Sequence, residues 1–158
     1  KMNSPDFIVS IIRTSLVYGV GVKANMMSFV KLIEKLPVLP FKNISNKRNF
    51  TYTENLVGFI DQVIEKKAPG VFIAMDEKAI STTELVNYIS KSLGRKIILF
   101  KVPQVFIRIG IRILPGIFDR LYCSLEVDNS KTLNVLDYKP PFSTEDGIKK
   151  MIDSYKKS

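Results

Sequence analysis

The stretch SLVYGVGVKANMMSFVKLIEKL, residues 15–36, decides the fold class, because it passes from a strand pattern through a glycine turn into a helix pattern. The segment DFIVSIIRTSLVYG, residues 6–19, is apolar and β-branched on both faces, as in a strand buried within a parallel sheet. Beyond the glycines, apolar residues recur at helical spacing until Pro37 stops the helix: Met26, Phe29, Val30, Ile33 and Leu36. A strand, a tight turn and a helix are therefore expected, which is the repeating unit of α/β folds.

The turn also carries a G-x-G-x-x-A motif at Gly19, Gly21 and Ala24, the pattern of a dinucleotide-binding loop. Such a loop needs an acidic residue about 20 positions later, at the end of a second buried strand, to bind the ribose. The sequence instead has PVLPFKN at residues 37–43, where two prolines disfavour a central strand and Lys42 replaces the carboxylate. We interpret the motif as a strand-to-helix turn.

The rest of the chain continues the alternation of helices and strands. Ser81 and Glu84 form a capping box before a helix that stops at Gly94, and Ser143 with Asp146 begins a last helix. The other expected elements are a loop at 36–50 with a short strand near its end, a helix at 53–67, and strands at 70–75 and 96–102. This order predicts an α/β fold with a partly parallel sheet.

The segment IRIGIRI, residues 107–113, has two readings. Its strict alternation fits a half-buried strand, but Arg108 and Arg112 are four residues apart and would share one face of a helix. Pro103 upstream and the length of the run to Pro115 favour the helix.

Composition bounds the class of protein. The 158 residues, 46% of them hydrophobic, suffice for one globular domain with a sizeable core. A formal net charge of +9 favours an anionic partner, which can be nucleic acid, a membrane surface or a phosphorylated small molecule.

The single cysteine, Cys123, and the absence of histidine exclude a disulfide, a zinc site and a histidine-dependent triad within the chain. We expect Cys123 to be a small buried hydrophobe. Arg13, Arg108 and Arg112 interrupt the longest apolar runs, so no membrane insertion is expected and the protein is interpreted as soluble and cytoplasmic. No tyrosine is followed by a lysine four residues later, the pair that short-chain dehydrogenases use, so no catalytic residue is expected in the chain.

Four blocks, in order, resemble a known family: IIRTSLVYGVGVKANMMSFV at 11–30, NKRNFTYTENLVGFI at 46–60, GVFIAMDEKAISTTELVNYISKSLGRK at 70–96 and SLEVDNSKTLNVLDYKPPFSTEDGI at 124–148. They are similar to the C-terminal half of an extended short-chain dehydrogenase/reductase of the NAD-dependent nucleotide-sugar epimerase/dehydratase family. The most similar members are bacterial UDP-N-acetyl-hexosamine 4-epimerases and 4-keto reductases of surface-polysaccharide synthesis.

This resemblance implies the C-terminal portion of a Rossmann-like NAD(P)-binding fold, its last parallel strands and helices, merged with a small α/β substrate-binding domain. Residues 1–22 would be a late Rossmann strand and turn. Residues 23–158 would be mostly substrate-binding subdomain with interleaved Rossmann elements. The family's cofactor loop and catalytic tyrosine and lysine lie in an N-terminal half that this chain does not contain.

The resemblance therefore implies an intact enzyme that uses NAD or NADP and a UDP-sugar, while this chain alone binds no cofactor and is inactive. Its partners would be the UDP-sugar and the missing half, with no metal and no nucleic acid. A strand apolar on both faces exposes an edge when its neighbours are absent, so the chain is also expected to self-associate.

Site residues follow from the matching positions in the family. Thr14 and Ser15 would lie beside the nicotinamide ring of the cofactor. Arg48 and Arg120 would bind the diphosphate, and the alternative for Arg48 is a solvated surface charge. Asn25 would face the sugar nucleotide, and the alternative is that it caps a helix. Leu39 and Phe41 would offer a flat apolar surface to the uracil ring, and the alternative is that they anchor a loop. Thr14 and Val20 replace two prolines of the family pattern.

Two readings from other classes remain open. One is a non-catalytic α/β binding module whose basic surface binds anions or nucleic acid, although the lysines and arginines are spread along the chain. The other is a relative of the dehydrogenases that lost catalysis and serves as a scaffold.

Overall fold

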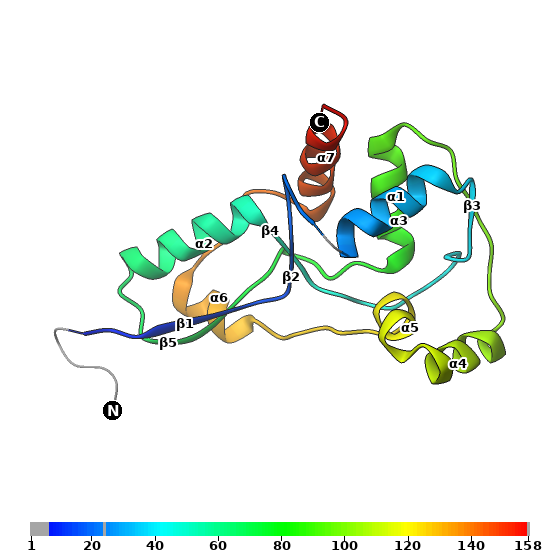
Figure 1. Cartoon of the computed structure of the whole chain (residues 1–158). Coiled ribbons are helices and arrows are strands. Elements are labelled where there is room, and N and C mark those ends of the chain that lie inside the picture. Colours follow the sequence, from blue (N-terminus) through cyan, green and yellow to red (C-terminus); the bar gives the residue numbers. More distant parts are fainter. Residues whose placement is uncertain (1–6, 24, 158) are drawn as a thin grey trace.

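A computed structural model describes residues 7–23 and 25–157 (Figure 1). Its strands are β1 (Ser10–Thr14), β2 (Leu16–Tyr18), β3 (Val38–Leu39), β4 (Phe50–Tyr52), β5 (Gly70–Ala74) and β6 (Ile98–Leu99). Its helices are α1 (Asn25–Lys35), α2 (Thr53–Glu65), α3 (Thr82–Leu93), α4 (Gln104–Ile113), α5 (Pro115–Tyr122), α6 (Ser130–Leu136) and α7 (Thr144–Tyr155). The α/β class expected from the sequence is confirmed.

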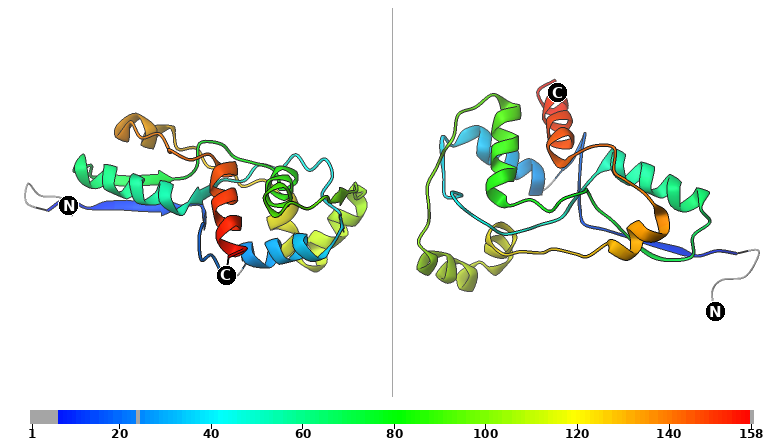
Figure 2. Two further views of the ribbon diagram at one scale, coloured as in Figure 1. Left: turned by 90° about the horizontal axis from the view of Figure 1, so that it is seen from above. Right: turned by 180° about the vertical axis from the view of Figure 1, so that it is seen from behind.

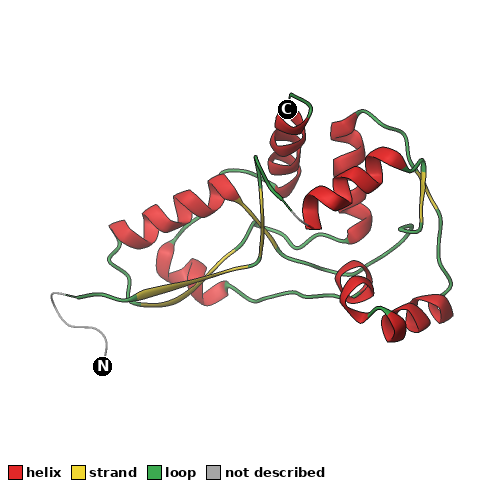
Figure 3. Cartoon of the chain, viewed as in Figure 1, coloured by secondary structure: helices red, strands yellow, loops and turns green. Residues whose placement is uncertain are grey.

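All strand pairs in the described part of the chain are parallel. β1 pairs with β5 from Ser10 opposite Gly70 to Thr14 opposite Ala74, β2 pairs with β4, and β3 pairs with β6. The strand expected at 6–19 is divided at Ser15, where the chain leaves β5 and turns to pair with β4; Figure 3 shows β2 running steeply away from β1. Asp6, the first residue of that expected strand, lies outside the described residues.

The composition of this strand is typical of a strand buried within a sheet, but much of its apolar surface is exposed, as expected for a strand whose neighbours are absent. Ile11 is 47% exposed, and Leu16 and Val17 are also exposed. The reason is that β1 has a described neighbour on one side only, so its other edge and much of its apolar surface have nothing to pack against.

The helix predictions are largely confirmed. In α3, Ser81 accepts a hydrogen bond from the Glu84 backbone N–H, and the helix ends at Leu93 with Gly94 as its C-cap in the left-handed conformation. In α7, Ser143 and Asp146 form the same capping box. Residues 107–113 lie within α4, so the helical reading of IRIGIRI is correct.

Other parts of the sequence prediction fail. Of the strand expected at 96–102, only Ile98–Leu99 pairs, because β3 offers just two residues opposite it. The sequence patterns did not predict β3, α5 or α6, whose two to eight residues are too few for a clear period. Cys123 is half-buried, and its thiol lies 3.6 Å from the Asp119 carboxylate, so it is not a core residue.

The two glycines form a strand-to-helix turn, as predicted from the sequence. Gly19 and Gly21 have positive φ angles of 157° and 76°, and α1 begins at Asn25. A side chain at Gly19 would overlap the Thr53 hydroxyl, so the turn packs closely against the start of α2. Ala24, the third position of the motif, lies outside the described residues.

Two hydrophobic clusters stabilise the chain, and Figure 2 shows from two further sides the helices and strands that carry them. The first core joins β2, β3 and β4 to α1, α3 and α7 around residues such as Tyr18, Val30 and Ile89. The second core joins α2, β5 and α6 around Phe59, Phe72 and Leu136. The open strand β1 lies beside the second core, whereas α4 and α5 lie at the other end of the molecule.

Candidate functional site

A cavity of about 540 Å³ lies between α1 and α5. Its wall is formed mostly by apolar side chains of α1, β4 and α5. The residues that line it are Leu16, Asn25, Met26, Ser28, Phe29, Leu32, Arg48, Phe50, Ile80, Thr82, Leu85, Gly116, Ile117, Arg120 and Leu121. Arg48 and Arg120 are the charged members, and no lining residue is acidic. We call this the arginine cavity.

Arg48 is held in place by backbone atoms on both sides. Its main chain bridges to Ile80 and Leu125, and its Nη1 donates to the carbonyl oxygens of Asp119 and Cys123 at 3.1 and 3.2 Å. These bonds fix the guanidinium beside the last turn of α5 and use only part of its five donors. The remaining N–H groups are available to an anion in the cavity, so Arg48 is not simply a solvated surface charge.

Arg120 and Asn25 reach the same cavity from elements far apart in the sequence. Arg120 is exposed on α5, and Asn25 is the exposed first residue of α1. The start of α1 adds backbone N–H groups and the positive end of a helix dipole. Three of the residues predicted to bind substrate are thus brought together here.

Leu39 and Phe41 do not line this cavity. They are 1% and 3% exposed and belong to the first core, where Phe41 packs edge-on against Phe29 at 5.6 Å between ring centroids. The expectation that their side chains offer a flat apolar surface to a base is wrong, because the loop folds these side chains inward as anchors. That this segment lies against the uracil ring stays a prediction.

Thr14 and Ser15 lie at the carboxyl end of β1, next to the carboxyl end of β5 at Ala74. Thr14 is exposed, and the Ser15 hydroxyl is 2.7 Å from the Thr51 hydroxyl, which in turn donates to the Ala74 carbonyl. Ligands of parallel α/β sheets bind beyond this end of the strands, so the position suits the predicted role without testing it.

Asp76 is an important residue that the sequence patterns did not single out. Its side chain is 1% exposed and accepts hydrogen bonds from the Tyr18 hydroxyl, the Tyr52 backbone N–H, the Asn55 amide and the Thr144 hydroxyl, at 2.8 to 3.2 Å. Burial, reinforced by the Asp76 charge, raises the pKa of Tyr18 far above its ordinary value. Asp76 joins β2, β4, α2 and α7 beneath the glycine turn.

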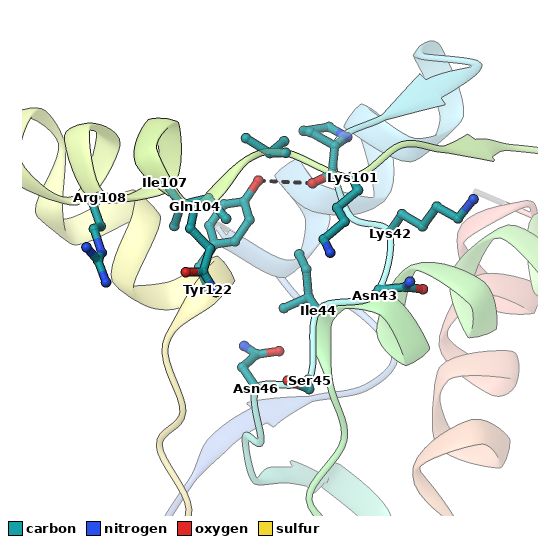
Figure 4. A pocket seen from close by; sticks show the side chains of 12 residues that line it. Lys42, Asn43, Ile44, Ser45, Asn46, Lys101, Gln104, Ile107, Arg108 and Tyr122 are labelled. Atoms are coloured by element: carbon teal, nitrogen blue, oxygen red, sulfur yellow. Dashed lines mark hydrogen bonds between the residues drawn. The ribbon is translucent and has the colours of Figure 1, made fainter.

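A second cavity of about 360 Å³ lies behind Tyr122 (Figure 4). The Tyr122 hydroxyl donates to the Pro40 carbonyl at 3.1 Å, which ties α5 to the β3 loop. Lys42, Lys101 and Arg108 belong to its lining, but Figure 4 shows Arg108 well apart from Lys42. The cations do not converge, so the arginine cavity is the better candidate site.

No family model matches the chain. The chain is 36% identical over 152 residues to a UDP-glucose 4-epimerase of Vibrio cholerae, an alignment that covers 93% of this chain and 46% of that protein. The chain therefore spans about half the length of the curated relative it matches.

Solved structures show the same fold. A UDP-N-acetylglucosamine 4-epimerase from Bacillus cereus superposes with a TM-score of 0.70 at 20% identity, covering 93% of this chain and 48% of that one. A UDP-glucuronic acid 4-epimerase from Bacillus cereus, in complex with a fluorinated UDP-sugar and NAD, gives 0.67 at 20% identity over 96% and 46%. A UDP-glucose 4-epimerase from Thermotoga maritima with UDP-glucose gives 0.63 at 16% identity over 94% and 46%.

Proposed function

Since this chain belongs to the extended short-chain dehydrogenase/reductase family of nucleotide-sugar epimerases and dehydratases, we propose that it is the substrate-binding C-terminal part of an NAD(P)-dependent enzyme acting on a UDP-sugar. The observation that carries the proposal is the arginine cavity, in which Arg48, Arg120 and the start of α1 converge on an apolar wall.

The chemistry of the cavity suits a nucleoside diphosphate. Arginine donates paired, charge-assisted hydrogen bonds to phosphate oxygens, and the absence of a lining acid leaves the positive charge unopposed. Asn25 and the backbone at the start of α1 add neutral donors. The apolar side chains of Met26 and Phe29 provide a surface for the flat base.

The cofactor belongs to the half of the enzyme that this chain lacks. NAD or NADP supplies hydride transfer at C4 of the sugar, and we place Thr14 and Ser15 beside the nicotinamide because they end β1 next to the carboxyl end of β5. The relatives support this side of the proposal, because one is described with NAD and another, an RMD from Pseudomonas aeruginosa, with NADPH.

Finer features also belong to the proposal. By its sequence blocks, the substrate is a UDP-linked N-acetyl sugar used in surface-polysaccharide synthesis. The chain alone is inactive, because no residue in it forms the tyrosine–lysine pair. Its open β1 edge and the exposed Ile11 favour self-association until the other half covers them.

The test is calorimetric titration of the chain with UDP at low salt. Hydrogen bonds from a charged donor contribute about 1.5–3 kcal/mol, so Arg48→Ala and Arg120→Ala should each weaken UDP binding by about 10- to 150-fold. Arg120 is exposed and makes no hydrogen bond with the described residues, so its variant separates binding from folding. Arg95→Ala, an exposed arginine after α3, is the matched control and should bind as the parent does.

Two results would overturn the proposal. One is UDP binding that neither Arg48→Ala nor Arg120→Ala weakens, with circular dichroism showing that both variants are folded. The other is steeply salt-dependent binding to DNA with no response to UDP, which would favour the basic binding module instead.

A further inference from the structure

Helix α4 (Gln104–Ile113) stands out because none of its residues is buried. Phe106 is 63% exposed and Ile113 is 69% exposed, and Val105 and Ile109 are exposed as well. A helix in a globular protein normally buries its apolar stripe against the core. Here the apolar stripe is exposed, and the helix lies at the end of the molecule opposite α2 (Figure 1).

The helix does contact the protein, but through a different face. Ile107, Gly110 and Ile111 are its half-buried residues, and the ring of Phe118 lies so close to Gly110 that no side chain would fit there. Val105, Ile109 and Ile113, spaced four apart, form a separate row, with Phe106 beside them. The outward row is therefore not needed to attach α4 to α5. We call Val105, Phe106, Ile109 and Ile113 the α4 stripe.

The charged residues of α4 itself are both positive. Arg108 and Arg112 lie four residues apart along the edge of the α4 stripe, and Lys101 precedes the helix. No acidic residue occurs between Lys101 and Asp119. An apolar stripe edged by cations is the pattern of a helix that lies in the interface of an anionic membrane.

The length of α4 fits this arrangement. Ten helical residues are about 15 Å long, half the thickness of a bilayer core, so the helix can lie on a membrane and cannot cross it. No helix in the described part of the chain is long and apolar enough to span a bilayer.

We propose that the α4 stripe, with Arg108 and Arg112, docks the chain on the surface of a bilayer that contains anionic lipids. The stripe enters the boundary between headgroups and acyl chains, and the two guanidinium groups bind lipid phosphates. A second copy of the chain is a poorer occupant, because pairing two stripes brings their arginines together with no acidic residue in 102–118 to oppose them. This inference uses none of the residues assigned to nucleotide binding.

The chain contains no tryptophan, so Phe106→Trp provides a single reporter. Its fluorescence should shift to shorter wavelength with vesicles of phosphatidylcholine and phosphatidylglycerol at a 7:3 ratio, and should not shift with phosphatidylcholine alone. Val57→Trp, on the exposed face of α2, is the control and should keep the emission of a water-exposed indole with both vesicles.

Sedimentation with the same vesicles measures the contributions to binding. Phe106→Ser with Ile113→Ser should weaken partitioning more than about 100-fold, whereas Val57→Ser with Ile64→Ser, exposed apolar residues also seven apart, should leave it unchanged. Arg108→Gln with Arg112→Gln should weaken it about 30-fold, as should a rise in salt. Lys31→Gln with Lys35→Gln, exposed on α1 and also four apart, is the matched charge control.

The proposal is overturned if binding does not depend on phosphatidylglycerol, or if the stripe variant binds as well as the parent, since another exposed apolar surface would then be responsible. It is equally overturned if the parent does not bind vesicles and light scattering shows that the parent is a dimer whereas the stripe variant is a monomer. That result would assign α4 to contacts between copies of the chain.

Discussion

Replacing Asp76 by alanine should destabilise the fold severely, because four donors converge on this buried carboxylate. One of them keeps another acceptor, because the Tyr18 hydroxyl also lies 3.2 Å from the Thr144 carbonyl. The Asn55 amide has two N–H groups and keeps the acceptor of only one, which donates to the Phe142 carbonyl at 2.8 Å. Three donors lose the acceptor that the structure shows for them: the second Asn55 N–H, the Tyr52 backbone N–H and the Thr144 hydroxyl.

The size of the effect follows from these three groups. Each buried donor left without an acceptor costs about 1–3 kcal/mol, so Asp76→Ala should lower the free energy of unfolding by about 3–9 kcal/mol. This is a large part of the total stability of a small domain, about 5–15 kcal/mol. Asp76→Asn keeps one acceptor oxygen and the side-chain shape, so its loss should be smaller, about 1–3 kcal/mol.

Urea denaturation followed by circular dichroism measures both variants against the parent. Asp61→Ala, an exposed carboxylate on α2, is the control and should stay within about 0.5 kcal/mol of the parent. If Asp76→Ala costs less than about 1 kcal/mol, the four hydrogen bonds do not stabilise the joint between β2, β4, α2 and α7, and the argument fails.

Gly147→Ala should also lower the free energy of unfolding, by about 1–3 kcal/mol, because a Cβ there would lie 2.6 Å from the Tyr18 hydroxyl and 2.8 Å from the Tyr52 ring. The control in the same denaturation experiment is Gly116→Ala, whose Cβ would meet no atom within 4 Å and which should be neutral or stabilising. Tyr18 and Tyr52 should lose their hydroxyl protons at higher pH than a free tyrosine. Burial and the Asp76 charge hold the pKa of Tyr18 well above its ordinary value, and burial with the Glu54 hydrogen bond raises the pKa of Tyr52 to about 12. Since these folded-state pKa values exceed the unfolded value of about 10, stability should be full below pH 10 and fall as the pH rises above it. Absorbance at 295 nm should therefore increase at higher pH in the folded chain than in urea, and identical titration curves would contradict the burial of these rings.

Sequence reasoning found the elements whose signals are local. The capping boxes at Ser81 and Ser143 lie within four residues of chain, and each begins its helix as predicted. The apolar spacing of 25–35 and the positive φ of Gly19 and Gly21 are likewise local, and the ordered blocks identified the family.

Tertiary contacts decided the rest, because burial and convergence depend on partners far along the chain. The apolar pattern of 6–19 predicts a strand that needs neighbours but does not say which edge of β1 is paired, and nothing local distinguishes the inward-facing Leu39 and Phe41 from a ligand surface. Asp76 links several elements by hydrogen bonds only when Tyr18 and Thr144, which are 58 and 68 residues away in the sequence, come into contact with it. The sequence by itself determined the helices of ten or more residues, the parallel α/β class and the family, whereas α5 and α6, the arginine cavity and the outward α4 stripe depend on how the elements pack.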